Sequence, residues 1–343
     1  MLTIVPPPRR SIIDQNKRLL PFNELFKKKR IALLKAAYYY LKNLNKYKKI
    51  LARSGFKNIT SLEELSKDFL TWSEKNGTSA LIPLFTMFIT DFGYGNLEQI
   101  PTIAIMKYIG AKPLIAIIFL TFGINMFGKW PRVFQQGYEN LWYKISQNLH
   151  VILTAKVTKI ERKNDRIYVI YHDQVISYDK LIIACPLDRV SEFLDVTAQE
   201  KNLFNKIKYV NYVVTVCEID NMPNGIFYFG RVNTGYPLIL SKLWQNPVCT
   251  VHSMSDGQGD LLLEERIKTE SEKIFSAKFR KIIAQEKWDY FPHFDQKDIT
   301  SGCYDQLENF QGKQNTYYVG SLLSFETVEH VVTYSKALVE NYF

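Results

Sequence analysis

The sequence has 343 residues, of which 46% are hydrophobic and 23% charged, and its formal net charge is +10. This length can bury a large core and suggests two or more folding units, and the composition is that of a globular protein rather than a disordered or fibrous one. The four cysteines have neither CxxC nor zinc-binding spacing, so we expect reduced residues in a reducing compartment and no metal site. They are Cys185, Cys217, Cys249 and Cys303.

The positive charge is concentrated in the first sixth of the chain, where only Asp14 and Glu24 oppose it. A solvated helix face explains such a cluster, and the functional alternatives are an anionic membrane surface, an acidic partner or an anionic substrate. No nucleic-acid-binding motif accompanies it, so we expect no nucleic acid partner. Prolines and arginines follow Met1 without an apolar segment, so no signal peptide is predicted. We expect a cytoplasmic protein, with peripheral membrane contact as the alternative.

Residues 1–19 are expected to form an extended segment, and residues 20–150 are expected to be mainly helical. An apolar stripe with intervening lysines predicts a helix over Leu20–Ala52, and a capping box at Ser61–Glu64 predicts another over Leu62–Lys75. Leu114–Phe127 is the most apolar run, but it is shorter than the roughly 20 residues of a membrane span. We interpret it as a buried helix, with a re-entrant membrane contact as the alternative.

From residue 151 the apolar pattern changes to a period of two, which is typical of β-strands. Residues 151–190 are therefore predicted to form a small β-meander followed by a returning strand of the buried parallel type. The predicted strands are Val151–Lys156, Val157–Arg162, Arg166–Tyr171, Gln174–Ser177 and Asp179–Pro186.

Residues 191–300 are predicted to contain antiparallel strands, a long amphipathic helix over Leu261–Ile283 and a further strand over Gln285–Phe291. Residues 301–343 predict a strand at Tyr317–Val319, a small-residue turn at Gly320-Ser321 and a helix that begins at Thr327. Such a helix start offers unpaired N–H groups and the positive end of the helix dipole, which favours an anion or a cofactor. An ordinary strand–turn–helix unit has the same features.

The tail Thr316–Phe343 resembles the C-terminal signature of the flavin-containing amine oxidase-like family, which includes monoamine oxidases, phytoene desaturases and protoporphyrinogen oxidases. The resemblance implies that Gly320 and Ser321 meet the ribityl chain of the flavin. It also implies that the helix start aims its N–H groups at the isoalloxazine ring; the matching residues are Thr327, Val328 and Glu329. The chain has Ser321 where the family usually has an acid, and His330-Val331 where Gly-Ala is usual.

The block Gln135–Pro186 resembles the same family over a helix, a strand, a β-meander and a returning strand. The resemblance implies that the backbone of Val157 pairs with the adenine of FAD. It implies further that Ala184 and Pro186, in the segment Ala184-Cys185-Pro186, lie near the cofactor phosphates.

Two aromatic segments resemble family residues on the substrate side of the flavin. They are the turn Gly93-Tyr94-Gly95 and the run Trp288–His293. A phosphate loop is the alternative for the glycine turn, although no strand precedes it and a third glycine is missing. We interpret His293 as a structural rather than a catalytic histidine, and no residue pair predicts the catalytic base. The predicted cavity wall consists of Tyr94, Trp288, Tyr290 and Phe291.

The family's strongest motif, a strand followed by GxGxxG and a helix, is not found in the sequence. Either Met1 lies inside a longer reading frame or the nucleotide-binding half has been lost. The predicted fold class is α/β (α+β mixed): an incomplete FAD-binding Rossmann-like domain plus a substrate domain with a mixed or antiparallel sheet and helices. We expect this chain alone to bind FAD weakly or not at all, and the Tyr317–Val319 strand to lack a neighbour, which favours association.

The resemblance implies an FAD-dependent oxidoreductase that oxidises, desaturates or isomerises a small apolar or amine substrate, with hydride transfer at the flavin. The alternative is a non-catalytic protein of the same fold that binds a lipid or an anionic membrane surface through the basic N-terminal helices. Bound flavin would favour the enzyme, and salt-sensitive liposome binding without flavin would favour the alternative. A degenerate remnant without activity is the third interpretation.

Overall fold

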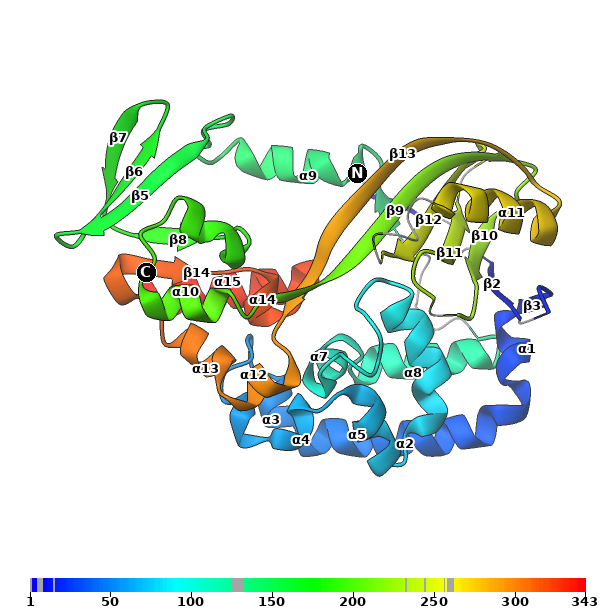
Figure 1. Ribbon diagram of the computed structural model, residues 1–343. Helices are drawn as coiled ribbons and strands as arrows, with labels where there is room; N and C mark the ends of the chain where they lie inside the picture. The colour runs from blue at the N-terminus through cyan, green and yellow to red at the C-terminus, as the bar shows by residue number, and fades with distance from the viewer. Residues whose placement is uncertain are drawn as a thin grey trace.

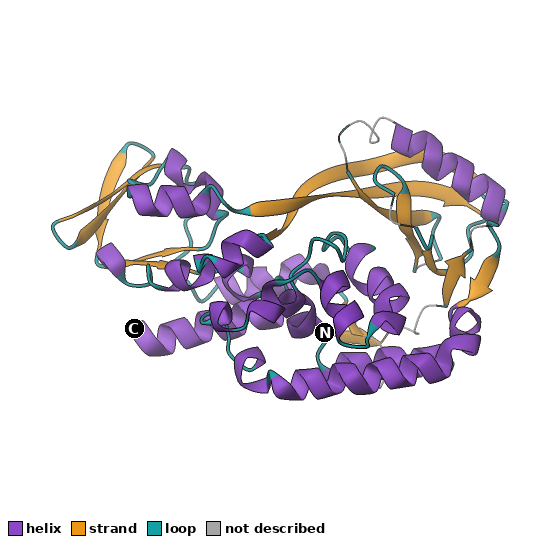
Figure 2. Cartoon of the chain, turned by 60° about the horizontal axis from the view of Figure 1, so that its bottom comes forward, coloured by secondary structure: helices purple, strands orange, loops and turns teal. Residues whose placement is uncertain are grey.

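The computed structural model describes residues 2–4, 9–14, 16–124, 132–231, 233–243, 245–255, 257 and 262–343. Figure 1 shows a large curved sheet at one end, helices from the first third of the chain beneath it, and a smaller αβ part that contains the C-terminus at the other end. Two long strands run from the large sheet toward this smaller part, as the secondary-structure view also shows (Figure 2). The predicted mixed α/β fold with a mixed sheet is confirmed.

The helical part is organised around α2 (Arg30–Lys46), whose inward face carries Leu33 and Tyr40, both without exposed surface. The Tyr40 ring packs edge-on against Phe85 and Trp72, with ring centroids 5.2 and 6.2 Å apart, an arrangement that aromatic quadrupoles favour. The other helices of this part are α1 (Phe22–Phe26), α3 (Lys48–Leu51), α4 (Glu63–Ser66), α5 (Phe69–Lys75), α6 (Ile82–Phe85), α7 (Thr102–Tyr108) and α8 (Ala111–Thr121).

Two helix boundaries in this part differ from the prediction. The predicted helix Leu20–Ala52 is divided into α1, α2 and α3, with a short 3₁₀ turn between the first two. The predicted capping box does not form, because the Ser61 hydroxyl donates to Asn58 instead. The predicted helix over Leu62–Lys75 is split, and Asp68 caps α5 by accepting a hydrogen bond from the Thr71 N–H at 2.8 Å.

The large sheet has the strand order β13-β9-β12-β11-β10-β2-β3 and is antiparallel except for the β10–β2 pair. One face packs on α11 (Leu263–Phe275) through Ile267, and the other packs on the helical part, where Tyr228 meets Phe22. The strands are β13 (Lys278–His293), β9 (Lys208–Asp220), β12 (Val248–Met254), β11 (Pro237–Lys242), β10 (Gly225–Tyr228), β2 (Arg10–Ile13) and β3 (Leu19–Pro21).

The predicted helix Leu261–Ile283 is wrong in its last turns. Helix α11 ends at Phe275, Ser276 adopts a left-handed conformation with φ of 52°, and β13 begins at Lys278. Pairing with β9 along nearly the whole of β13 overrides the local helical pattern. Residue 261, where the predicted helix starts, lies outside the described residues.

The smaller αβ part contains the meander β5 (Val157–Lys163), β6 (Arg166–Tyr171) and β7 (Gln174–Tyr178), and a parallel pair of β8 (Leu181–Ile183) with β14 (Thr316–Tyr318). The predicted strand Val151–Lys156 is wrong: this segment is irregular, with a turn at residues 153–154. The helices of this part are α10 (Ala198–Phe204), α12 (Gln296–Thr300), α13 (Cys303–Glu308), α14 (Ser321–Ser324) and α15 (Val328–Tyr342).

The β8–β14 pair has one closed edge and one open edge. The Gln311 side chain closes the β14 side, because its Oε1 accepts from the Tyr318 N–H and its Nε2 donates to the Tyr318 carbonyl, each at 2.8 Å. On its other side β8 pairs with no described strand, and its Ile182 is 43% exposed. An open apolar edge of this kind is a template for pairing with another chain.

We expect Ile182→Lys to lower self-association, because a charge on an edge strand disfavours pairing with a second edge. Sedimentation velocity over a concentration series measures the effect, with Ile182→Val as the matched control. Equal sedimentation of the lysine variant and the wild type, with both associating, would contradict the assignment of this edge.

The remaining elements are β1 (Leu2–Ile4), which pairs with β4 (Arg132–Phe134), and α9 (Gly137–Ser146). Among the described residues, no single helix has the length and apolar character of a membrane span, although α7 and α8 together do, with a 77° bend between them. The predicted buried helix Leu114–Phe127 overlaps α8, and its residues 125–127 lie outside the described residues.

Candidate functional site: the cavity at the ends of β8 and β14

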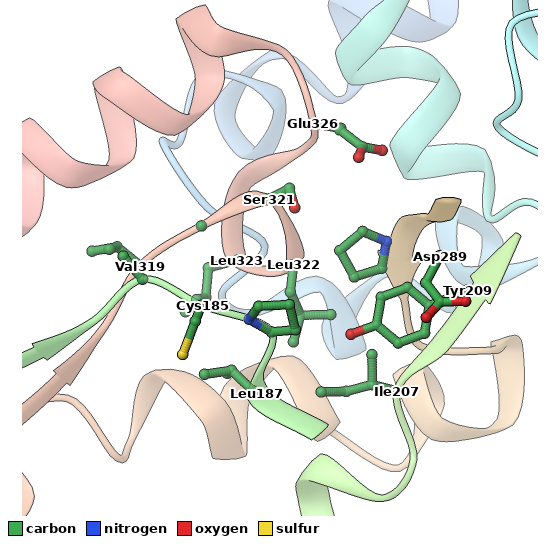
Figure 3. Close-up of a pocket in the computed structure, with 14 residues that line it drawn as sticks. Cys185, Leu187, Ile207, Tyr209, Asp289, Val319, Ser321, Leu322, Leu323 and Glu326 are labelled. Atoms are coloured by element: carbon green, nitrogen blue, oxygen red, sulfur yellow. The ribbon is translucent and has the colours of Figure 1, made fainter. Parts of the chain in front are cut away.

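A cavity of about 190 Å³ lies at the carboxyl ends of β8 and β14, where the chain leaves both strands (Figure 3). In open α/β sheets this is the position at which ligands bind. The lining residues come from the two strand ends, from α14 and from strands of the large sheet that reach this point. They are Ala184, Cys185, Pro186, Leu187, Ile207, Tyr209, Asp289, Pro292, Val319, Gly320, Ser321, Leu322, Leu323 and Glu326.

Gly320 gives the cavity an open wall. Its φ of +129° is a conformation that residues with a side chain rarely adopt, and a Cβ placed there would meet no atom within 4 Å. The backbone conformation therefore explains the glycine, because no neighbouring atom would clash with a side chain there. The glycine also leaves space beside the end of β14. A ligand can approach the main chain closely at this point.

We expect Gly320→Ala to lower the free energy of unfolding by about 1–3 kcal/mol, because alanine is strained at this φ. Gly110→Ala is the matched control: a Cβ at Gly110 also meets no atom within 4 Å, but its φ is −69°. Urea unfolding of both variants makes the comparison. Equal losses would show that backbone conformation is not what requires a glycine at the end of β14.

The structure brings together four of the residues that the resemblance assigns to the cofactor: Ala184, Pro186, Gly320 and Ser321 all line the cavity. The other four do not line it. Val157 begins β5, opposite Tyr171, and Thr327 caps α15 by accepting from the His330 N–H. Val328 and Glu329, in the first turn of α15, are exposed.

Three of the four predicted cavity-wall aromatics meet in one buried cluster. The Tyr94 ring lies 5.6 Å from Tyr290, 5.4 Å from Phe291 and 5.3 Å from Phe325. Trp288 does not join this cluster: its side chain is 54% exposed, and the neighbouring Asp289 lines the cavity. Trp288 and Tyr290 are two positions apart on β13 and share one face of the strand, so Trp288 lies where that face is open to solvent.

The GYG turn packs against β9. A Cβ on Gly93 would lie 2.8 Å from the Tyr212 ring, and one on Gly95 would lie 3.1 Å from Val210. Both glycines also have positive φ, 91° and 93°. Close packing and backbone conformation therefore explain the glycines, and the phosphate-loop alternative has no support here.

Glu326 is a half-buried acid at the cavity that the sequence did not single out. Its Oε2 has no hydrogen-bond partner among the described residues. Burial raises the pKa of Glu326 to about 7. The sequence does place an acid directly before the helix cap Thr327, which could have indicated this site. The resemblance instead assigned the cofactor contact to Glu329.

The backbone around Glu326 is strained. Phe325 has φ of 126° and ψ of 158°, and Phe291 has φ of 53°, both unusual for residues with a bulky side chain. The two rings lie 5.6 Å apart. Strain of this kind persists where the surrounding structure enforces it and is common at functional sites.

His293 is placed as a structural histidine. Its ring stacks on Phe291 with centroids 4.9 Å apart, and its Nδ1 lies 2.7 Å from the Phe291 carbonyl. Burial lowers the pKa of His293. Among the described residues, no three His, Cys, Asp or Glu side chains could together hold a metal ion, and all four cysteines are free, with only Cys185 exposed.

The family model of flavin-containing amine oxidoreductases matches residues 8–298 of this chain. The chain therefore belongs to the flavin-containing amine oxidoreductase family, and the predicted family is confirmed. It is 23% identical over 297 residues to the FAD-dependent oxidoreductase oblC of Cochliobolus heterostrophus, a match that covers 76% of this chain and 58% of that protein. The chain thus spans little more than half the length of this relative.

Solved structures share the fold. A CLA-producing fatty acid isomerase from P. acnes superposes with a TM-score of 0.86 at 21% identity, over 99% of this chain and 81% of that one. Cyclohexylamine oxidase from Brevibacterium oxydans superposes with a TM-score of 0.60 at 12% identity, over 99% of this chain and 82% of that one. The family implies a flavin cofactor.

The residues at the cavity fit part of such a cofactor. The open side of Gly320 and the strand end at Ala184–Pro186 leave room for a ligand that follows the main chain. However, about 190 Å³ is less than the 300–1,000 Å³ that is typical of small-molecule and cofactor pockets. Within the described ranges, no strand leads through a GxGxxG turn into a helix, which is the element that holds a dinucleotide pyrophosphate.

Proposed function

We propose that this chain forms the substrate side and part of the flavin site of an FAD-dependent oxidoreductase that acts on an apolar or amine substrate. The observation that carries the proposal is the cavity where Gly320, Ser321, Ala184 and Pro186 meet. The reaction class is oxidation, desaturation or double-bond isomerisation, for which a bound flavin supplies hydride transfer. The relatives named for a fatty acid isomerase and an amine oxidase support this range of substrates.

Within this proposal, Glu326 exchanges a proton with the substrate. Glu326 is one of the residues that line the cavity, one of its carboxylate oxygens has no partner, and its pKa of about 7 is close to the pH at which proton transfer in both directions is efficient. The buried aromatic cluster next to it excludes water and supplies an apolar wall. The residues of this chain thus provide a proton-exchanging group and an apolar surface beside the flavin position.

We infer that the chain by itself binds FAD weakly, because the small cavity can contain only part of the cofactor. The test supplies millimolar FAD to the purified protein with a panel of unsaturated fatty acids and aliphatic amines, and detects products by mass spectrometry. We expect turnover of one class, lost in Gly320→Trp. If FAD is shown to bind and neither class is converted, the proposed function is wrong. Equimolar flavin in the purified protein would instead contradict weak binding.

A further inference from the structure

The outward face of α2 carries a row of exposed apolar side chains. Ile31 is 85% exposed, Leu34 49% and Tyr38 64%. Residues three, four and seven apart lie above one another on a helix, so these three form one continuous stripe. The opposite face already supplies the core through Leu33 and Tyr40, so burial within this chain does not explain the stripe.

Lysines lie along one side of this stripe, and the neighbouring sequence contains no acidic residue. Residues 25–62 contain eleven lysines and arginines and no aspartate or glutamate. Lys28, Lys35 and Lys42 are exposed, and none makes an ion pair with another described residue. Lys35 and Lys42 are each four residues from a member of the apolar stripe, so charge and apolar surface lie side by side.

A shallow hollow beside the apolar stripe is bordered by further lysines. It lies between α2 and α5 and is bordered by Lys35, Lys42, Lys46 and Lys75. Glu64 pairs with Lys46 at 2.8 Å, and the other three have no acidic partner among the described residues. Anionic groups the size of a phospholipid head group can enter such an open hollow from solvent.

The apolar surface continues to the C-terminal end of α8 and the residue that follows it. The Arg30 guanidinium donates to the Thr121 carbonyl at 3.0 Å and lies 4.8 Å from the centre of the Phe122 ring, which is 36% exposed. Both views show α2 along an outer side of the molecule, away from the β8–β14 site (Figures 1 and 2). Docking through this face would leave the cavity free.

We propose that the face formed by Ile31, Leu34, Tyr38, Lys28, Lys35 and Lys42 docks on an anionic lipid bilayer. The combination of apolar residues on one line with basic residues beside them is that of a helix that lies in the membrane interface. The lysines are attracted by the negative surface potential of acidic lipids, and the apolar stripe enters the boundary between head groups and acyl chains. An acidic protein or a nucleic acid would engage the lysines but would give no role to Ile31. The proposal stands independently of the flavin chemistry.

Flotation with phosphatidylcholine vesicles, with and without phosphatidylglycerol, tests the proposal on the full chain. We expect binding to the acidic vesicles only, with a large loss at 1 M salt, where the Debye length falls to about 3 Å. The combined substitution Lys28→Gln, Lys35→Gln and Lys42→Gln should weaken binding by about 100-fold, since each lysine near such a surface contributes about fivefold. Its matched control replaces Lys201, Lys278 and Lys297, exposed lysines elsewhere, and should change binding little.

A second variant separates membrane docking from simple charge attraction. Ile31→Ser, Leu34→Ser and Tyr38→Ser keep every charge, and we expect at least a tenfold loss of vesicle binding with an unchanged circular dichroism spectrum. The control replaces Val332 and Val339, exposed valines of α15, with serine. Vesicle binding that persists in the serine variant, or salt-sensitive retention on DNA or acidic protein without vesicle binding, would overturn the proposal.

Discussion

Arg162→Met is expected to lower the free energy of unfolding by about 3–5 kcal/mol, the cost of leaving a buried charge without its partner. The Arg162 side chain is 1% exposed and donates to both carboxylate oxygens of Glu200 at 2.8 Å and to Asp195 at 2.7 Å. The Tyr318 hydroxyl donates to the same Glu200 at 2.5 Å. This cluster connects β5, α10 and β14, so its loss loosens the αβ part that positions Gly320.

Arg166→Met is the matched control, because Arg166 lies on the neighbouring strand and pairs with Asp179 at the surface. A surface pair contributes about 0–1 kcal/mol, so this variant should unfold almost as the wild type does. Chemical denaturation of the three proteins at pH 7 measures the difference. A loss below 1 kcal/mol for Arg162→Met would show that the cluster does not hold the αβ part together.

The pH dependence of the same variant follows from Glu200. Burial acts to raise the pKa of Glu200, but hydrogen bonds from Arg162 and Tyr318 hold it at about 2. A depressed carboxylate pKa contributes stability that is present above its unfolded value and lost as the pH falls toward 2. Without Arg162, Glu200 can take up a proton in mild acid. The difference in the free energy of unfolding between the wild type and Arg162→Met should therefore be smaller at pH 4 than at pH 7.

Glu326→Gln is expected to remove a stability loss that the wild type suffers as the pH rises. The pKa of Glu326 is raised from 4.5 to about 7 by burial, so the neutral form is favoured in the folded protein. Its contribution to stability is complete below pH 4.5 and is lost as the pH rises through 7, by at most about 3 kcal/mol. The free energy of unfolding of Glu326→Gln, relative to that of the wild type, should therefore increase between pH 5 and pH 8.

Glu329→Gln serves as the control, since Glu329 is exposed on the first turn of α15. Thermal or urea unfolding at pH 5 and pH 8 gives the comparison for all three proteins. Parallel pH profiles for Glu326→Gln and the wild type would mean that Glu326 is already ionised or solvated, and its proposed part in proton exchange would fail with it.

The sequence predicted the family, the strand before Gly320 and the helix capped by Thr327, because these depend on local residue order. It did not predict the short helix α14, which begins at Ser321 where a turn was expected. It also predicted that the Ala184–Pro186 strand end and the Gly320 turn belong to one site, and they share the cavity. The predicted bounds of the meander strands after residue 156 are close to those of β5, β6 and β7. In this segment the alternation of apolar residues and the positions of the turn residues indicate the same strands.

Features that depend on pairing between distant segments were not predictable. The extent of β13 depends on β9, some 70 residues earlier, and the local pattern favoured a helix. Trp288 shares a face of β13 with Tyr290, and the sequence could not show that this face is open to solvent at Trp288. Glu326 becomes unusual only when β13 and the β14–α15 connection bury it against Phe291.

Hydrogen–deuterium exchange in the presence of millimolar FAD tests most directly whether the ends of β8 and β14 form part of a flavin site. We predict added protection in residues 184–187 and 319–326, absent with AMP alone and absent in Gly320→Trp. Protection confined to other segments, or none at concentrations where FAD binding is detected by fluorescence, would contradict the assignment of this cavity.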